Sequence, residues 1–161
     1  MKNRFYLLLI IPLMASCSSE SNRAEQNIAI IENYIRSVEH LDYQTMESLL
    51  DDQYLGMGPS YGDSINKETA VANWKYLVEN LYESIHYSRS RNVAVTISSG
   101  DNQGDWVSNW GELTIRYKNT EDSVTIWANS IYQIEDGKIV KSFTFYNEAD
   151  ALRQLGYYFI Y

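Results

Sequence analysis

The chain has 161 residues, of which 45% are apolar, and a formal net charge of −8 at pH 7. This length suits a single folded domain, and the composition is not that of a disordered chain. The negative charge argues against nucleic acid and anionic lipid headgroups as partners, because both bind through positive charge. Cysteine occurs once, at Cys17, so the chain cannot form an internal disulfide.

The first residues have the pattern of an export signal. Lys2 and Arg4 precede the apolar run "FYLLLIIPL", which is too short to span a bilayer, and the small residues of "MASC" follow. The end of this segment resembles the bacterial lipoprotein box, which implies lipidation of Cys17 after cleavage. The alternative is an ordinary secretory signal that is cut near Ala15.

The resulting organisation has three parts. Residues 1–16 are predicted to be a lipoprotein signal peptide, and residues 17–23 the lipidated cysteine and a small, polar tether. Residues 24–161 are predicted to form the folded domain. We therefore expect a protein of the bacterial cell envelope, periplasmic or surface-exposed, that touches the membrane only through its lipid.

Apolar spacing predicts three helices in the first half of the domain. Apolar residues recur at three- and four-residue intervals from Ile28 to Val38, which indicates a helix that ends near His40. Asp42 can cap a second, short helix, and Asn66 a third. The expected apolar stripe of the third helix is Val71, Trp74, Leu77, Val78, Leu81 and Ile85. Between the second and third helices, "DDQYLGMGPSYGDS" indicates a hairpin or an irregular loop.

A period of two then predicts four strands, within residues 89–97, 106–117, 124–134 and 139–146. The connections "SGDNQGD", "KNTEDS" and "EDGK" are short enough to join antiparallel neighbours. A short C-terminal helix follows, with Gly156 after its end. The fold class predicted is α+β, with three N-terminal helices on one face of a curved antiparallel sheet.

Three stretches carry a resemblance to a known superfamily: "YIRSVEHLDYQTMESLLDD", "INKETAVANW" and "DGKIVKSFTFYNEADALRQLG". In this order they resemble the nuclear transport factor 2-like superfamily, and within it the SnoaL-like (polyketide cyclase-like) branch, over residues 24–156. The resemblance implies a cone-shaped fold with its mouth between helices and sheet. Members include isomerases, dehydratases, epoxide hydrolases, cyclases and proteins without known chemistry, so the fold does not decide the function.

The sequence contains none of the common catalytic signatures. It has no G-x-S-x-G elbow, no phosphate-binding loop and no dinucleotide fingerprint. Its two histidines, His40 and His86, lie far apart in different predicted elements. No metal site and no cofactor is therefore expected.

Tyr34 is the first candidate catalytic residue. In ketosteroid isomerases of the superfamily, a tyrosine eight residues before a capping aspartate donates to the oxyanion, and Tyr34 with Asp42 matches that spacing. The alternative is that Tyr34 packs in the core. The place of the isomerase base falls on Met57 or Gly58, neither of which can accept a proton.

Glu112 is the second candidate, as a base held in an apolar wall. Strand alternation puts it on the same face as Trp106 and Trp110, and burial there would raise its pKa. The alternative is a solvent-facing carboxylate paired with a Lys or Arg on a neighbouring strand.

Asn147 lies where the last predicted strand meets the last helix. The cyclase branch tends to have an aspartate there, whereas an asparagine can bind a ligand but cannot act as a general base. The alternative is a helix cap, supported by Asp150 three residues later in a capping-box-like position.

Aromatic residues with isolated polar groups predict a pocket for a small apolar or ring-shaped molecule. Its expected lining is Tyr34, Tyr54, Met57, Trp74, Trp110, Trp127, Asn129 and Asn147. Two alternatives stay open: a filled core, or an apolar face on the open side of the sheet that forms a homodimer. The sequence thus predicts a lipid-anchored, non-enzymatic small-molecule-binding domain. The alternatives are a cofactor-free isomerase or cyclase and a dimerising interaction module.

Overall fold

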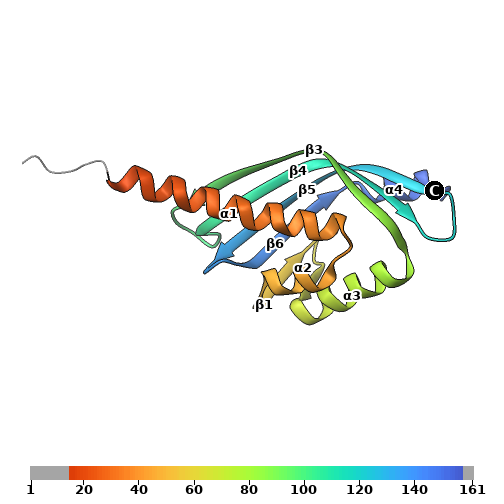
Figure 1. The fold of residues 1–161 in the computed structure, drawn as a ribbon, viewed down its shortest axis with the longest axis horizontal. Helices are drawn as coiled ribbons and strands as arrows, with labels where there is room; N and C mark the ends of the chain where they lie inside the picture. The colour runs from red at the N-terminus through yellow and green to blue at the C-terminus, as the bar shows by residue number, and fades with distance from the viewer. Residues whose placement is uncertain (1–14, 158–161) are drawn as a thin grey trace, which may run out of the picture.

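A computed structural model describes residues 15–157 of the chain (Figure 1). Four helices and six strands follow one another within these residues. In chain order they are α1 (Ala15–Glu39), α2 (Tyr43–Leu49), β1 (Leu50–Met57), β2 (Ser64–Asn66), α3 (Lys67–Asn80), β3 (Tyr82–Ile97), β4 (Gly104–Tyr117), β5 (Ser123–Glu135), β6 (Lys138–Tyr146) and α4 (Glu148–Gln154). Residues 1–14 of the predicted signal peptide lie outside the described range.

The starts of α2 and α3 are as predicted. The Asp42 side chain accepts a hydrogen bond from the Thr45 amide at 3.0 Å, and the Asn66 side chain accepts one from the Thr69 amide at 2.9 Å. These bonds satisfy amides that have no partner inside the helix. The predicted end of α3 is wrong, because the helix stops at Asn80 and Ile85 belongs to β3. Ile85 is an inward-facing strand residue that falls by chance at helical spacing.

The start of the domain also differs from the tether expected from the sequence. Residues 17–23 are helical, since α1 runs without interruption from Ala15. Arg23, at the end of this segment, forms an ion pair with Asp105 on β4 at 2.9 Å. The last residue of the segment is therefore tied to the sheet.

The sheet is mixed, which corrects the predicted antiparallel sheet. The strand order is β2-β1-β6-β5-β4-β3, and β1 runs parallel to β6. Of the two alternatives predicted between the second and third helices, a hairpin or an irregular loop, the hairpin is confirmed as β1 and β2, which pair antiparallel. The sequence concealed the parallel pair because its strands lie at opposite ends of the domain, and short connections report only on neighbours in the chain.

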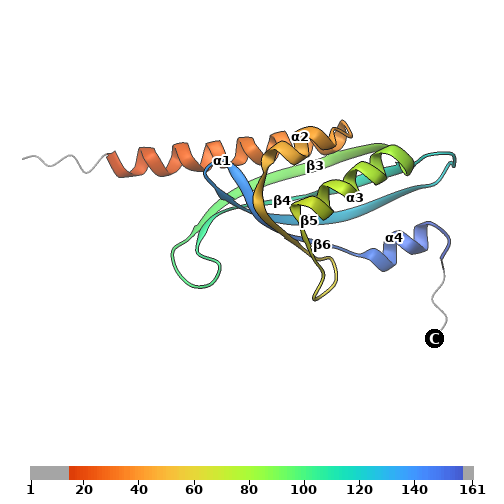
Figure 2. The ribbon, with the colours of Figure 1, turned by 90° about the horizontal axis from the view of Figure 1, so that it is seen from below.

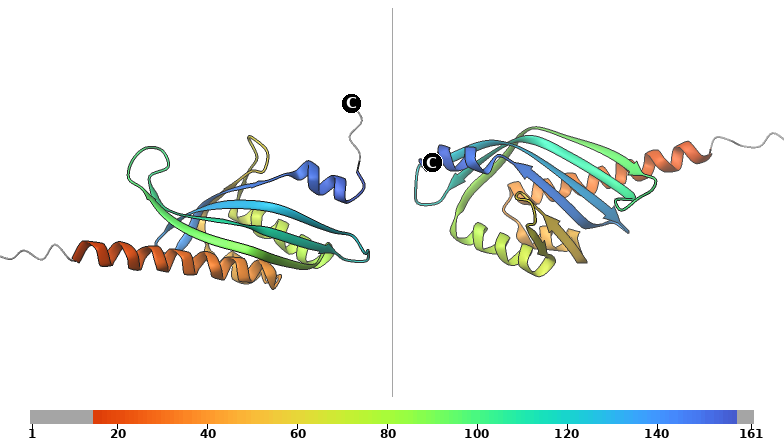
Figure 3. Two further views of the ribbon diagram at one scale, coloured as in Figure 1. Left: turned by 90° about the horizontal axis from the view of Figure 1, so that it is seen from above. Right: turned by 180° about the vertical axis from the view of Figure 1, so that it is seen from behind.

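Helices α1 and α3 pack against the concave side of this curved sheet (Figure 2). Helix α4 follows the end of β6, apart from α1 and α2, and contacts β5 (Figure 3). The side chains that are most deeply buried lie between helices and sheet: Ile31, Met46, Val107, Val124 and Ile139. We call the helix-covered side of the sheet the inner face and the opposite side the outer face.

A β-bulge in β3 changes which residues face inward along that strand. The register shifts between Ser88 and Arg91, and Arg89 there has a φ of 53°. The buried Asn109 amide donates to Ser90 Oγ and to the Arg91 carbonyl, so the backbone freed by the bulge keeps a partner. As a result the Arg89 side chain lies over the outer face, beside Trp127.

Candidate functional site

A cavity of about 400 Å³ lies between the inner face and helices α1, α3 and α4. Its volume is within the range of roughly 300–1,000 Å³ that is usual for small-molecule sites. Seven tyrosines line it, together with one tryptophan and many aliphatic side chains. Among the described residues, Glu148 is the only lining residue that carries a charge at neutral pH. The space between helices and sheet is therefore a pocket and not a filled core.

Four tyrosines from four different elements meet in the deep part of the cavity: Tyr34 of α1, Tyr54 of β1, Tyr87 of β3 and Tyr132 of β5. We call them the inner tyrosines. The rings of Tyr34 and Tyr132 stand edge to face, with centroids 5.6 Å apart. Each ring comes from an inward-facing position of its strand or helix.

Burial keeps these phenols protonated. It raises the pKa of Tyr34 well above its usual value, with the neighbouring Tyr132, Tyr54 and Tyr87 adding to the effect. Burial likewise raises the pKa of Tyr87 to about 12 and that of Tyr132 further still. The desolvated phenolate is the unfavourable form in each case. At neutral pH the deep cavity therefore offers neutral hydroxyl groups, which can both donate and accept hydrogen bonds.

Tyr54 depends on a glycine for its position. Its hydroxyl lies 2.7 Å from Ser142 Oγ on β6, across the parallel strand pair. A Cβ atom at Gly56 would lie only 2.6 Å from this hydroxyl. Gly56 thus provides the space that lets the Tyr54 ring lie along β1 and reach Ser142.

The opening of the cavity is lined by a second aromatic group: Trp74 of α3, Tyr82 of β3, Tyr117 of β4 and Tyr146 of β6. We call them the mouth aromatics. Trp74 and Tyr82 stand edge to face at 6.5 Å, and Tyr82 and Tyr117 do so at 5.8 Å. Burial, and then the proximity of Tyr117 and Tyr146, raises the pKa of Tyr82 to about 12. The rings of Trp74, Tyr82 and Tyr117 therefore form one connected aromatic cluster.

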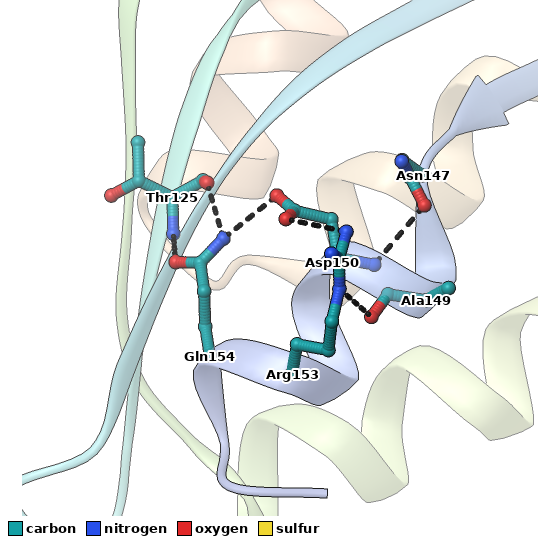
Figure 4. A network of polar contacts seen from close by, with 6 residues as sticks. All are labelled: Thr125, Asn147, Ala149, Asp150, Arg153 and Gln154. Atoms are coloured by element: carbon teal, nitrogen blue, oxygen red, sulfur yellow. Dashed lines mark hydrogen bonds and ion pairs between the residues drawn. The ribbon is translucent and has the colours of Figure 1, made fainter. Parts of the chain in front are cut away.

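Helix α4 closes one side of the mouth with Ala151, Leu152 and Leu155. Its first turn is capped by the Asn147 side chain, which accepts a hydrogen bond from the Asp150 amide at 3.0 Å (Figure 4). The capping alternative for Asn147 is confirmed. The reciprocal bond of a capping box is not made, because Asp150 instead accepts from Arg153 and Gln154.

The end of α4 is fixed by a glycine and by a glutamine. Gly156 has a φ of +83°, and its amide donates to the Arg153 carbonyl, as in a helix that ends at a glycine. Gln154 forms two hydrogen bonds of 2.9 Å with the backbone of Thr125 (Figure 4). Strand β6 pairs with β5 only as far as Ala128, so the Gln154 amide takes the place of a strand partner at Thr125.

The predicted pocket residues divide between two places. Those that line the cavity are Tyr34, Tyr54, Met57 and Trp74. Trp110, Trp127 and Asn129 lie on the outer face, where Trp110 is 43% and Trp127 60% exposed. Asn147 is exposed at the start of α4 and is not part of the lining. The prediction of a pocket contact is thus wrong for these last four residues, since alternation on β4 and β5 turns the three strand residues away from the helices.

Glu112 also lies on the outer face, so it is not a carboxylate of the cavity wall. Its carboxylate accepts a hydrogen bond from Ser88 Oγ at 2.8 Å and lies 3.6 Å from the Arg89 guanidinium. The alternative prediction, a surface carboxylate paired with an arginine of the neighbouring strand, is confirmed. Tyr34, the other catalytic candidate, is buried and reaches the cavity, which is compatible with both of its predicted roles.

The sequence reading missed most of the inward-facing residues of the sheet, among them Tyr87, Ser130, Tyr132 and Ser142. Their signal was present in β5, where Val124, Ile126 and Ala128 precede Ser130 and Tyr132 at every second position. Strand alternation places all five on one face. The tryptophans on the intervening positions attracted the prediction instead.

Two further properties concern only residues 15–157. No group of three or more His, Cys, Asp or Glu side chains is placed to hold a metal ion there. Within the same range, none of the helices has the length and apolarity required to cross a membrane.

Comparison with known proteins shows the fold. No family model and no curated protein sequence matches the chain. Solved structures do: an epoxide hydrolase of the LEH-like type from M. tuberculosis has a TM-score of 0.63 at 13% identity, over 83% of this chain and 91% of the other. An NTF2-like protein from Burkholderia xenovorans LB400 has a TM-score of 0.62 at 15% identity, over 81% and 96%.

One of these structures is described as a "putative SnoaL-like polyketide cyclase", from Shewanella denitrificans OS-217, with a TM-score of 0.61 at 13% identity, over 80% of this chain and 95% of the other. A "putative polyketide cyclase" from Xanthomonas campestris pv. campestris has a TM-score of 0.67 at 11% identity, over 82% of this chain and 98% of the other. The chain has the nuclear transport factor 2-like fold. The fold predicted from the sequence is thereby supported, and at these identities the likeness concerns the fold alone.

Proposed function

We propose that the chain is a small-molecule-binding domain whose ligand is a largely apolar, ring-shaped molecule held in the cavity. The observation that carries this proposal is the chemistry of the lining. Aromatic and aliphatic walls favour an apolar ring, and the protonated inner tyrosines can bind one or two hydroxyl or carbonyl groups on it.

The charge states of the candidate catalytic residues support binding rather than proton transfer. The base proposed from the sequence, Glu112, lies on the outer face, and the inner tyrosines hold their protons at neutral pH. A cofactor-free isomerase or cyclase is the alternative, in line with the cyclases among the similar structures. In that case Tyr34 would donate to the oxyanion, and Glu148 at the mouth would have to accept the proton.

The outer face favours a second function, as a dimerising interaction module. Trp110, Trp127 and Phe145 come from three adjacent strands and are each at least 43% exposed. Apolar patches of this kind mark protein contacts in soluble domains. We infer that a second copy of the chain covers this face. Replacing Trp127 with serine should then shift the molecular mass in solution from dimer to monomer, whereas a monomeric parent protein would contradict the inference.

We also propose that residues 1–16 are a lipoprotein signal peptide and that Cys17 carries the lipid, so that the domain faces the periplasm or the cell surface. The charged start, the short apolar run and the small residues before Cys17 support this proposal. In a detergent phase partition of cell extract, Cys17→Ser should move the protein to the aqueous phase. Unchanged partition would contradict the anchor.

A fluorescence titration of the full chain with naphthol tests the binding function. Naphthol has a fused ring and one hydroxyl group, which matches the walls and the inner tyrosines. We expect saturable binding that Tyr132→Phe weakens by several-fold, because this change removes only a hydroxyl group. Trp127→Phe on the outer face of the same strand is the matched control and should leave the affinity unchanged. An equal loss from both variants, or no binding, would contradict the proposal.

A further inference from the structure

The mouth of the cavity differs from its deep part in geometry and in charge. The Tyr82 ring stands edge to face with Trp74 and also with Tyr117, at interplanar angles of 64° and 63°. The three rings therefore form walls in different planes. Tyr146 adds a fourth aromatic side chain from β6. A ring that lines a space can attract a cation through its negative face, and rings in different planes offer such faces in several directions.

The charged group of the lining lies at this same place. Glu148, in the first turn of α4, lines the cavity together with Tyr146, which precedes it by two residues in the chain. After burial, this carboxylate is the next largest influence that raises the pKa of Tyr146. Negative charge and aromatic faces are therefore combined at the mouth.

The nearby cations do not neutralise this arrangement. Lys118 follows Tyr117, but its ammonium group donates to the carbonyls of Val78 and Glu79 at the end of α3. Arg153 of α4 is paired with Asp150 at 3.2 Å. Neither side chain is among the residues that line the cavity.

We propose that the mouth aromatics and Glu148 bind an organic ammonium group, so that the ligand is an amphiphile with its cation at the mouth and its apolar ring among the inner tyrosines. This inference rests on the proposed binding function and names the class of ligand. Cation–π contacts with several rings, added to a carboxylate at the edge of a partly desolvated site, are the means by which proteins bind alkylated ammonium groups. Tyr34 and Glu148 both line this cavity, so one ligand can contact the inner tyrosines and the carboxylate together.

A pair of isosteric probes tests the inference. Benzyltrimethylammonium and neopentylbenzene have the same shape and differ in the replacement of the cationic nitrogen by carbon. Each is used to displace naphthol from the full chain. We expect the cation to act at a concentration about tenfold lower than its neutral isostere. Equal displacement by the two probes would overturn the inference while leaving the proposed function intact.

Two variants in which glutamine replaces a glutamate show whether Glu148 causes the preference for the cationic probe. In Glu148→Gln the advantage of the cation should fall by about threefold, because the charge at the mouth is lost. Glu47→Gln on the exposed side of α2 removes the same charge away from the cavity and should change nothing. An unchanged advantage in Glu148→Gln would also overturn the inference. If naphthol itself does not bind the parent protein, the proposed function fails and this inference fails with it.

Discussion

Tyr132 and Trp127 lie five residues apart on β5 and point to opposite sides of one sheet. Tyr132 is 7% exposed and packs against Tyr34 in the cavity, whereas Trp127 is 60% exposed beneath the Arg89 guanidinium. Both faces are rich in aromatic residues, but only the inner one is covered by helices. The comparison shows that aromatic content alone does not identify a binding cavity; the cover provided by α1, α3 and α4 does.

The largest expected difference between the two faces is in stability. Tyr132→Ala should lower the free energy of unfolding by about 3–5 kcal/mol, because it removes a buried ring and enlarges the cavity. In the monomer, Trp127→Ala should change it by only about 0.5 kcal/mol, since there its ring is mostly in water. Urea denaturation of the two variants measures both values. Equal losses would mean that the outer face is also covered in solution.

High pH should lower the free energy of unfolding through the buried tyrosines of the inner face. The pKa values of Tyr82 and Tyr87 are raised to about 12, so between pH 10 and 12 the folded chain holds protons that the unfolded chain has lost. Their stabilising contribution is complete below pH 10 and disappears as the pH rises through 12. Urea denaturation at increasing pH should show this fall, with phenolate absorbance appearing on unfolding. A free energy of unfolding that stays constant up to pH 12 would contradict the buried placement.

A smaller change should disturb the inner face through β1. Gly56→Ala places a Cβ atom 2.6 Å from the Tyr54 hydroxyl, so the ring must move away from Ser142. We expect a loss of about 1–3 kcal/mol in the free energy of unfolding, together with weaker naphthol binding. Gly62→Ala is a control at a glycine with no atom within 4 Å of the added group, although its positive φ adds strain of its own. A neutral Gly56→Ala would show that Tyr54 is not fixed in this position.

The smallest expected change in stability concerns α4, the helix that closes the mouth. Asn147→Ala should lower the free energy of unfolding by about 1 kcal/mol, because the Asp150 amide loses its partner. Asn147→Asp should keep or slightly raise stability, since a carboxylate accepts the same bond and suits a helix start. Thermal denaturation of the two variants measures the difference. If alanine is neutral, the cap does not hold α4.

These residues also show how far the sequence could predict the structure. Helical spacing and caps at Asp42 and Asn66 predicted α2 and α3, and alternation predicted the cores of β3 to β6. The parallel pairing of β1 with β6 could not be predicted, because it joins segments far apart in the chain and β1, with the sequence LDDQYLGM, lacks a regular alternation of apolar and polar residues. Only tertiary contacts decide such a pairing.

Only half of the predicted pocket residues line the cavity, and the reason is related. Alternation groups Trp110 with Glu112, and Trp127 with Asn129, and each grouping is correct. Alternation does not say which face the helices cover, and that choice was wrong for these residues. Ser130 and Tyr132 were overlooked because small polar and aromatic residues on the inner face resemble those on the outer one.

The most direct test of ligand binding in the cavity is to observe which face of the sheet responds to ligand. Methyl groups on both faces of the sheet can be followed by NMR in the full chain during a naphthol titration. We expect that the signals of Leu113, Ile115 and Ile126, which line the cavity, shift with saturation, while those of Val93 and Ile131 on the outer face stay in place. Shifts confined to Val93 and Ile131 would contradict it and would assign ligand binding to the exposed tryptophan face.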